Sequence, residues 1–229
     1  MVNSQKPKSS GGDIAHKAVK AGLSLIPWVG GSAAEIFAAI MAPPLQKRRD
    51  QWIEDIAKEL GDLRDKRPEI NLDELLTSDK FITVVLHATQ TALKNHQKEK
   101  LEALKNSILN AALRTDLDED LQMVFMRYID ELTPWHLRIL TYFQDPDGWL
   151  KVHGVMMSNL MFGGLKEGVY RAFSELKNEG ELYEQIVADL KNRGLLKGFS
   201  DGSMSMQGIL ASRTSELGSR FISFIQVPI

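Results

Sequence analysis

The sequence predicts an all-α protein, apart from one small β-hairpin near its carboxyl end. Apolar residues recur at helical spacing in most segments between residues 13 and 225, and Ser, Thr or Asp stands where several of these segments begin. The chain has 229 residues, of which 43% are hydrophobic and 25% charged, so it holds enough apolar side chains for a core. We expect an amino-terminal helical bundle joined to a carboxy-terminal domain that contains the hairpin.

Composition and charge exclude several classes of protein. The chain has no Cys, which rules out a disulfide scaffold, a thiolate metal site and a thiol nucleophile. Its 8 Pro and 17 Gly are too few for a low-complexity chain, and its net charge is −2. Basic residues are concentrated in residues 1–50, which hold seven Lys or Arg against three Asp or Glu.

The first 44 residues divide into two parts. Residues 1–12 (MVNSQKPKSSGG) are expected to be a disordered leader. Residues 13–44 are expected to be an apolar helical segment, with one short helix after Asp13 and another after Ser32. Pro27 and the Gly-Gly pair that follows it interrupt this segment, so it does not read as one continuous helix.

Residues 45–131 are expected to form the helical bundle. The run that starts at Phe81 is apolar nearly all round, which is typical of a buried central helix. Its β-branched content also fits a strand, but good helix formers continue from Ala88 to Lys94 and favour a helix. The expected helices run from Leu45 to before Pro68, over 72–76, 81–94 and 101–112, and from 118 to 131.

Residues 133–229 are expected to form the second domain. Thr133 and Pro134 are a cap and a first helical residue. The sequence Ser200-Asp201-Gly202-Ser203 has the composition of a hairpin turn. The expected elements are a helix over 135–143, a turn at 145–148, an irregular connection over 149–164, helices over 165–178 and 181–193, strands over 195–199 and 204–210, and a helix over 214–225.

Three sequence blocks of this domain resemble those of bacterial winged-helix proteins. TPWHLRIL resembles the opening helix, YEQIVADLKNRGLL the recognition helix that ends in Arg-Gly-Leu, and SRTSELGSRFISFI the closing helix after the wing. The resemblance covers residues 133–226 and implies a winged-helix-like domain. The layout of the whole chain is similar to that of the bacterial abortive-infection alpha family, which implies an anti-phage or stress setting and brings no enzymatic residues.

No catalytic, cofactor-binding or metal-binding residue is assigned, and we expect a non-enzymatic protein. The five histidines do not occur at H-x-x-x-H, H-x-H or H-E-x-x-H spacing. The chain has no phosphate-binding G-x-x-x-x-G-K-[ST] loop, no G-x-G-x-x-G after a strand and no G-x-S-x-G elbow. His136 follows Trp135 at a helix start, where partial exposure is expected.

Residues 21–42 (AGLSLIPWVGGSAAEIFAAIMA) are long enough to span a bilayer, but Pro27 and Glu35 disfavour a single spanning helix. Three interpretations stay open: packing on the protein's own core, cover by a partner subunit through self-association, and conditional insertion into an anionic membrane. The expected membrane or partner contacts are Ile26, Trp28, Phe37 and Ile40. Because no signal peptide is recognisable, the expected location is cytoplasmic, peripheral to the inner membrane where the segment inserts.

The helix over residues 182–193 is the candidate for contact with nucleic acid. The residue types suited to phosphates and base edges are Gln185, Lys191, Asn192 and Arg193. Glu181, Glu184 and Asp189 would repel a phosphate backbone, so a structural or protein-binding use is favoured over DNA reading.

The leading hypothesis is therefore a non-enzymatic bacterial defence or stress protein that acts by assembly and conditional membrane interaction of its apolar amino-terminal segment. A winged-helix DNA-binding regulator is the first alternative. A scaffold that binds an unidentified protein partner is the second.

Overall fold

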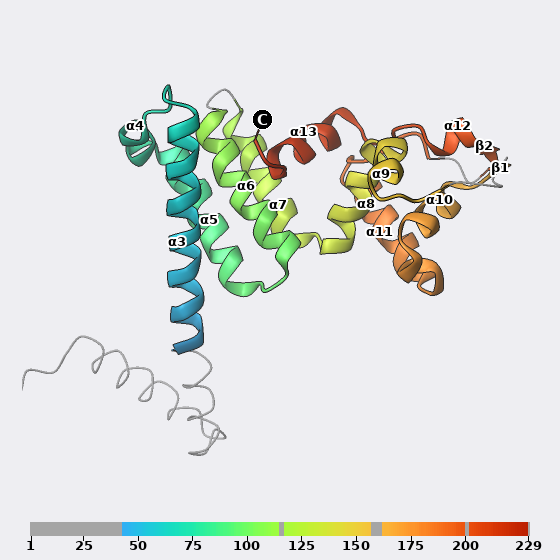
Figure 1. The fold of residues 1–229 in the computed structure, drawn as a ribbon, viewed down its shortest axis with the longest axis horizontal. Helices are drawn as coiled ribbons and strands as arrows, with labels where there is room; N and C mark the ends of the chain where they lie inside the picture. Colours follow the sequence, from blue (N-terminus) through green and yellow to red (C-terminus); the bar gives the residue numbers. More distant parts are fainter. Residues whose placement is uncertain (1–42, 115–116, 157–161, 200–201, 229) are drawn as a thin grey trace, which may run out of the picture. The chain divides into compact units, whose positions relative to one another are not determined.

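The computed structural model describes residues 43–114, 117–156, 162–199 and 202–228, and this part of the chain is predominantly helical, as the sequence predicts. The chain divides into two compact units after Asp55. The helix α3 (Pro43–Lys66) runs across that division, and all other described elements belong to the second unit. Helices and strands carry the labels of Figure 1.

After α3, four further helices of the described residues precede the connection at residue 132. They are α4 (Leu72–Thr77), α5 (Asp79–Lys94), α6 (Lys98–Leu113) and α7 (Glu119–Glu131). The side chain of Ser78 caps α5 by accepting from the Phe81 N–H, and Asp118 caps α7 by accepting from Leu121. Figure 1 shows α5, α6 and α7 side by side, and their fully buried residues include Val84, Ala88, Leu104, Ile108, Phe125 and Ile129.

The rest of the unit consists of short elements. They are α8 (Pro134–Gln144), α9 (Pro146–Val152), β1 (Phe162–Gly163), α10 (Leu165–Ala172), the 3₁₀-helix η1 (Ser174–Asn178), α11 (Gly180–Asn192), β2 (Met204–Ser205), α12 (Met206–Ile209) and α13 (Glu216–Ile225). Aromatic rings make the core of these elements. The ring of Tyr142 lies 5.7 Å from that of Trp149 and 5.9 Å from that of Phe173.

The predicted hairpin between residues 195–199 and 204–210 is wrong. The two-residue strand β2 pairs antiparallel with β1, residues 206–209 form α12, and Leu196 makes an isolated bridge with Thr214. Arg213 supplies a physical reason, because its guanidinium donates to the carbonyl oxygens of Gly198 (3.0 Å) and Gly208 (2.7 Å), so that one side chain and not a strand ladder joins the two predicted strands.

Two helical predictions in this region also need correction. The predicted turn at 145–148 opens the helix α9, because the carboxylate of Asp145 accepts from the Gly148 N–H at 2.9 Å and Pro146 stands at the first helical position. The single helix expected over 165–178 is two, α10 and η1. Between them Phe173 leaves helical geometry and buries its ring against Trp135 and Trp149.

The start of α13 is fastened to the end of α11. Gly194, at φ +71°, ends α11 in a Schellman motif, in which its N–H donates to Lys191 and the N–H of Leu195 donates to Leu190. Ser215 then donates from its hydroxyl to the Gly194 carbonyl at 2.6 Å and from its N–H to the Leu195 carbonyl at 3.0 Å. The backbones approach so closely that a Cβ on Gly218 would lie 2.2 Å from the Leu195 oxygen.

The other end of α13 is fastened to α6. The side-chain amide of Asn106 donates to the Ile225 carbonyl at 3.0 Å, and that of Asn110 donates to Phe224 at 3.1 Å and Gln226 at 2.8 Å. Both asparagines are buried, and they satisfy main-chain carbonyls that a helix end otherwise leaves unpaired. The ring of Phe224 also lies 5.6 Å from that of Phe125 on α7.

Gly218→Ala is expected to lower the free energy of unfolding by about 1–3 kcal/mol, because the added methyl group meets a fixed backbone carbonyl. Gly61→Ala is the matched control. Gly61 lies inside α3, where an added Cβ would have no neighbour within 4 Å, so this change is expected to raise stability by about 0.5–1 kcal/mol. Urea unfolding of both variants measures the difference, and equal effects of the two changes would contradict the close approach.

Candidate functional site

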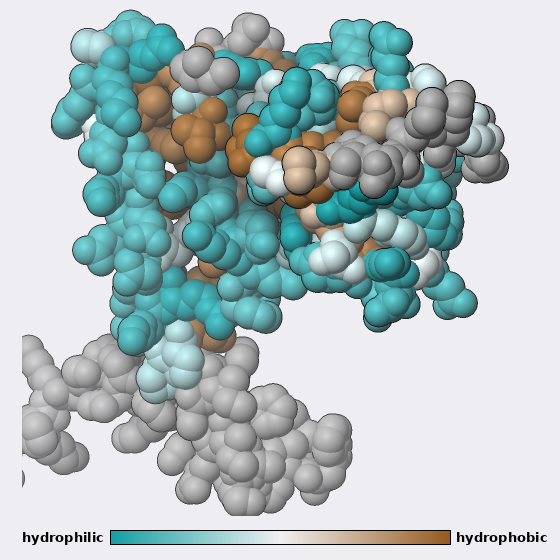
Figure 2. All heavy atoms as spheres, turned by 45° about the vertical axis from the view of Figure 1, so that its right-hand side comes forward, coloured by the Kyte–Doolittle hydropathy of each residue, from teal (hydrophilic) through white to brown (hydrophobic). Residues whose placement is uncertain are grey.

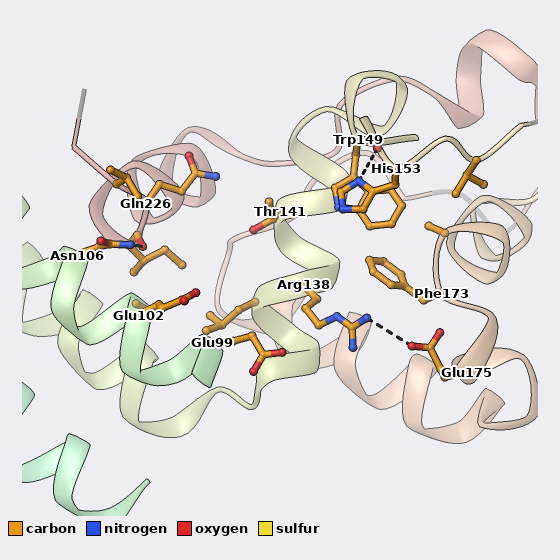
Figure 3. A pocket seen from close by; sticks show the side chains of 16 residues that line it. Glu99, Glu102, Asn106, Arg138, Thr141, Trp149, His153, Phe173, Glu175 and Gln226 are labelled. Atoms are coloured by element: carbon orange, nitrogen blue, oxygen red, sulfur yellow. Dashed lines mark hydrogen bonds and ion pairs between the residues drawn. The ribbon is translucent and has the colours of Figure 1, made fainter. Parts of the chain in front are cut away.

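A cleft of about 670 Å³ is the candidate site. Its walls come from α6, α8 and α9, from Ala172 to Glu175 and from Ile225 to Val227, all within the second unit. Figure 3 shows Glu99, Glu102, Asn106 and Gln226 on one side, Trp149, His153, Phe173 and Glu175 on the other, and Arg138 and Thr141 from α8 between them.

One wall of the cleft is aromatic. The imidazole of His153 stacks on the indole of Trp149, with ring centroids 3.7 Å apart and planes 10° from parallel. The Nδ1–H of His153 donates to the Trp149 carbonyl at 2.8 Å, one helical turn earlier. The ring centroid of Phe173 lies 4.9 Å from that of Trp149. This contact supports the indole, so the stacked rings of Trp149 and His153 form a preformed flat surface.

Arg138 lies beside this wall, where its guanidinium contacts two aromatic rings and one carboxylate. Its guanidinium carbon lies 4.1 Å from the centroid of Trp135 and 5.1 Å from that of Phe173. Its Nη2 pairs with Glu175 at 3.5 Å. The pKa of Glu175 is lowered, first by the backbone N–H of its own residue and then by Arg138, so this carboxylate is charged at neutral pH.

The opposite wall is acidic and the floor is apolar. Glu99 and Glu102 are exposed one turn apart on α6, and Glu102 has only a distant ion pair, at 3.7 Å, with Lys98. Ala103, Leu137 and Ile225 form the floor.

Apolar side chains at the cleft edge reach solvent. The lining residue Val227 is 73% exposed, and Val152 and Met156, on either side of the lining residues His153 and Val155, are 84% and 79% exposed. Most of the surface visible in Figure 2 is hydrophilic by contrast. Together the walls and edges offer aromatic and aliphatic contact area beside carboxylates, which is suited to binding.

The sequence did not point to this cleft. It assigned Trp149 and His153 to an irregular connection, and it gave no role to Glu99, Glu102 or Arg138. The i, i+4 spacing of Trp149 and His153 was the one available signal, and it depends on recognising that Asp145 and Pro146 begin a helix.

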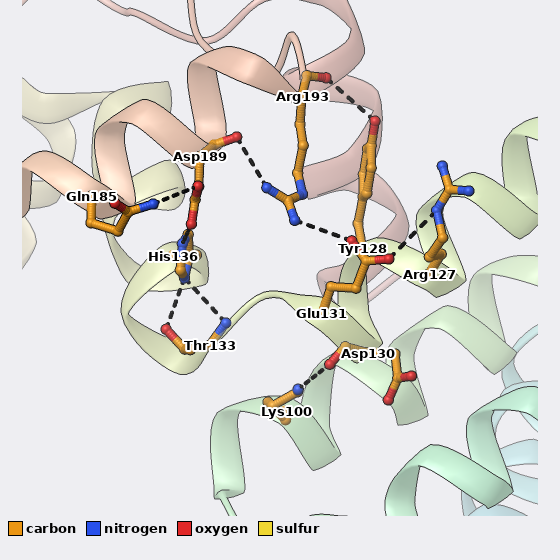
Figure 4. A network of polar contacts seen from close by, with 10 residues as sticks. All are labelled: Lys100, Arg127, Tyr128, Asp130, Glu131, Thr133, His136, Gln185, Asp189 and Arg193. Atoms are coloured by element: carbon orange, nitrogen blue, oxygen red, sulfur yellow. Dashed lines mark hydrogen bonds and ion pairs between the residues drawn. The ribbon is translucent and has the colours of Figure 1, made fainter. Parts of the chain in front are cut away.

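The four candidate nucleic-acid contacts lie on or just after α11, and Figure 4 shows two of them, Gln185 and Arg193. Gln185, Lys191 and Asn192 are exposed, and the amide of Gln185 donates to Asp189 at 2.9 Å. Arg193 is half-buried and turned toward α7, where its Nη2 donates to Glu131 at 3.1 Å. The structure therefore leaves three of the four side chains facing solvent and uses the fourth to hold α11 on α7.

The four candidate membrane or partner contacts, Ile26, Trp28, Phe37 and Ile40, lie outside the described residues, as does the whole segment 13–42. Within the described ranges, no helix combines the length and apolar character needed to cross a bilayer. In the same ranges, no three His, Asp or Glu side chains gather in a way that could hold a metal ion.

His136 joins α8 to α11 and is buried, so the expectation of partial exposure is wrong. Its Nδ1 accepts from the Thr133 N–H at 3.2 Å and completes the cap of α8, while its Nε2 faces the Asp189 carboxylate at 3.4 Å (Figure 4). Burial lowers the pKa of His136, and the nearby Arg193 and Lys100 lower it further, while Asp189 opposes them. The neutral ring, with its proton on Nε2, satisfies both neighbours.

A scan of protein-family models, a search of curated proteins and a search of solved structures each found no match to this chain.

Because the pKa of His136 is lower in the folded chain, the unfolded chain takes up a proton first as the pH falls below about 6.5. The free energy of unfolding is therefore expected to drop from pH 7 to pH 5. His136→Asn keeps an oxygen that can accept from Thr133 and removes the titration, so its stability is expected to fall less over the same range.

Urea unfolding at a series of pH values measures the two slopes. His96→Asn is the control, because His96 is exposed, and its slope is expected to match that of the unchanged chain. An unchanged slope in His136→Asn would show that this buried ring does not couple stability to pH.

Proposed function

We propose that this chain is a non-enzymatic protein-binding module and that the cleft beside α6, α8 and α9 receives the partner. The observation that carries the proposal is the placement of a rigid aromatic pair and exposed aliphatic side chains at one cleft, with exposed carboxylates on its opposite wall. Protein interfaces use this combination, with aromatic anchors at the centre and a charged rim.

We further infer that residues 133–229 are a winged-helix-like domain. In support, α8, α9, β1, α10, η1 and α11 follow one another in this order, and hydrogen bonds join Lys197 to Arg213 and Ser215 to Leu195 on either side of an antiparallel bridge. On this interpretation the loop between the two sides of the bridge is the wing, and α11 is the recognition helix. Protein binding is favoured over DNA reading, because Arg193 is committed to Glu131, and Glu181 and Glu184 are exposed.

Site-directed photo-crosslinking tests the cleft. A benzoylphenylalanine in place of Val227, at the cleft edge, is expected to give a discrete crosslinked partner in cells. The same residue in place of Leu182, an exposed apolar position on α11, is the matched control and is expected not to capture that partner. Thr141→Trp, which fills the cleft, is expected to abolish the Val227 product. Equal products from both positions, or a product that survives Thr141→Trp, would reject the cleft as the site.

Conditional membrane interaction of residues 13–42 is the second candidate function. The sequence favours it, because the basic residues of the first fifth of the chain overlap its longest apolar stretch. Such an activity would fit the defence or stress setting that the resemblance to the abortive-infection alpha family implies.

Liposome flotation tests this second function. The full chain is expected to float with anionic vesicles and not with neutral ones, and a chain lacking residues 13–42 is expected to stay at the bottom of the gradient with both. Absence of flotation by the full chain, or equal flotation of the two chains, would remove the membrane role.

A further inference from the structure

We infer that the occupant of the cleft is a basic amphipathic helix of the partner protein. This inference rests on the proposed function and adds the chemistry of the ligand.

The charge of the lining selects a cation. Among the described side chains that line the cleft, the only Lys or Arg is Arg138, and Glu175 neutralises it. Glu99 has no ion pair within the described residues, and Glu102 has only the exposed, distant one with Lys98. The rim therefore keeps two carboxylates, which would attract Lys or Arg and repel an acidic segment or a nucleic acid.

The spacing of these carboxylates fits a helical ligand. Glu99 and Glu102 stand three residues apart on α6, so they lie on one face, about one turn from each other. Two basic residues spaced by one turn on a second helix can face them together. The floor beside them, made by Ala103, Leu137 and Ile225, continues to the exposed Val227 and offers a stripe of apolar contact next to the charges.

Main-chain bonding also favours a helix over an extended segment. Three of the segments that line the cleft are helices, and the N–H and C=O groups of α6, α8 and α9 are bonded within each helix, apart from those of the end turns. In the two other lining segments, the carbonyl of Phe173 accepts from the Leu176 N–H at 3.1 Å and the carbonyl of Gln226 accepts from Asn110 at 2.8 Å. An extended ligand would find few partners for its own main chain here, whereas a helix satisfies its main chain internally.

Fluorescence anisotropy with the full chain tests the inference. The probe is a labelled peptide of Leu and Lys, about four helical turns long, with the Leu residues at helical spacing, and the control peptide carries Glu in place of every Lys. The Lys peptide is expected to bind at least about tenfold more tightly than the Glu peptide at low salt, and this preference is expected to shrink at high salt.

Variants of the protein locate the binding. Glu99→Lys combined with Glu102→Lys is expected to weaken binding of the Lys peptide by about tenfold. The matched control is Glu119→Lys combined with Asp120→Lys, which makes the same charge change at exposed positions of α7, outside the cleft lining, and is expected to change binding by less than about twofold. Thr141→Trp, which closes the cleft, is expected to weaken binding as well. Equal losses from both charge reversals, or equal binding of the two peptides, would overturn the inference.

The crosslinking and peptide-binding experiments together distinguish failure of this inference from failure of the proposed function. If Val227 captures a partner in cells while the Lys peptide does not bind, the cleft receives a ligand of different chemistry and only the inference fails. If neither occurs, both fail. Tighter binding by a peptide of residues 13–26 than by the Lys peptide would assign the cleft to this chain's own sequence and overturn the partner protein as its occupant.

Discussion

The second unit depends on the anchoring of α13 at both of its ends. At its first turn, Ser215 forms hydrogen bonds to the carbonyl oxygens of Gly194 and Leu195. The backbone of α13 comes so close to the Leu195 carbonyl that position 218 has no room for a Cβ, which is why Gly stands there. Its last turn is fixed to α6 by the buried amides of Asn106 and Asn110. The bonded residues are 119 positions apart in the sequence in one pair and 114 in the other, so α13, whose first turn is bonded to the end of α11, connects α11 to α6.

The cleft is a consequence of this anchoring. Ile225, Gln226 and Val227 form one of its walls only because the end of α13 is held on α6. Glu99 and Glu102 come from the first turns of α6, and the aromatic pair comes from α9, a short helix that needs Asp145 as its cap. A binding surface is thus assembled from elements that are far apart in the sequence, and a few polar contacts hold these elements in position.

A network of polar contacts holds α7, α8 and α11 together. His136 completes the cap of α8 and faces Asp189, while Arg193 bonds the Asp189 carbonyl and pairs with Glu131. The network explains why Arg193, which the sequence offered as a nucleic-acid contact, is directed inward. It also explains the burial of His136. A histidine three residues after an N-cap can place its ring nitrogen against the N–H of the cap residue, as His136 does with Thr133.

The sequence by itself determined the helical character of the chain and most helix starts, since Ser78, Asp118 and Thr133 act locally on the residues that follow them. It also determined the contrast between its basic, apolar beginning and its acidic remainder. Only the tertiary structure decided which short segments pair, because β1 and β2 are distant in the sequence and Arg213 bonds both Gly198 and Gly208, which belong to the two predicted strands of the hairpin. The cleft was decided there as well, since its carboxylates, aromatic rings and floor come from distant segments that no local pattern connects.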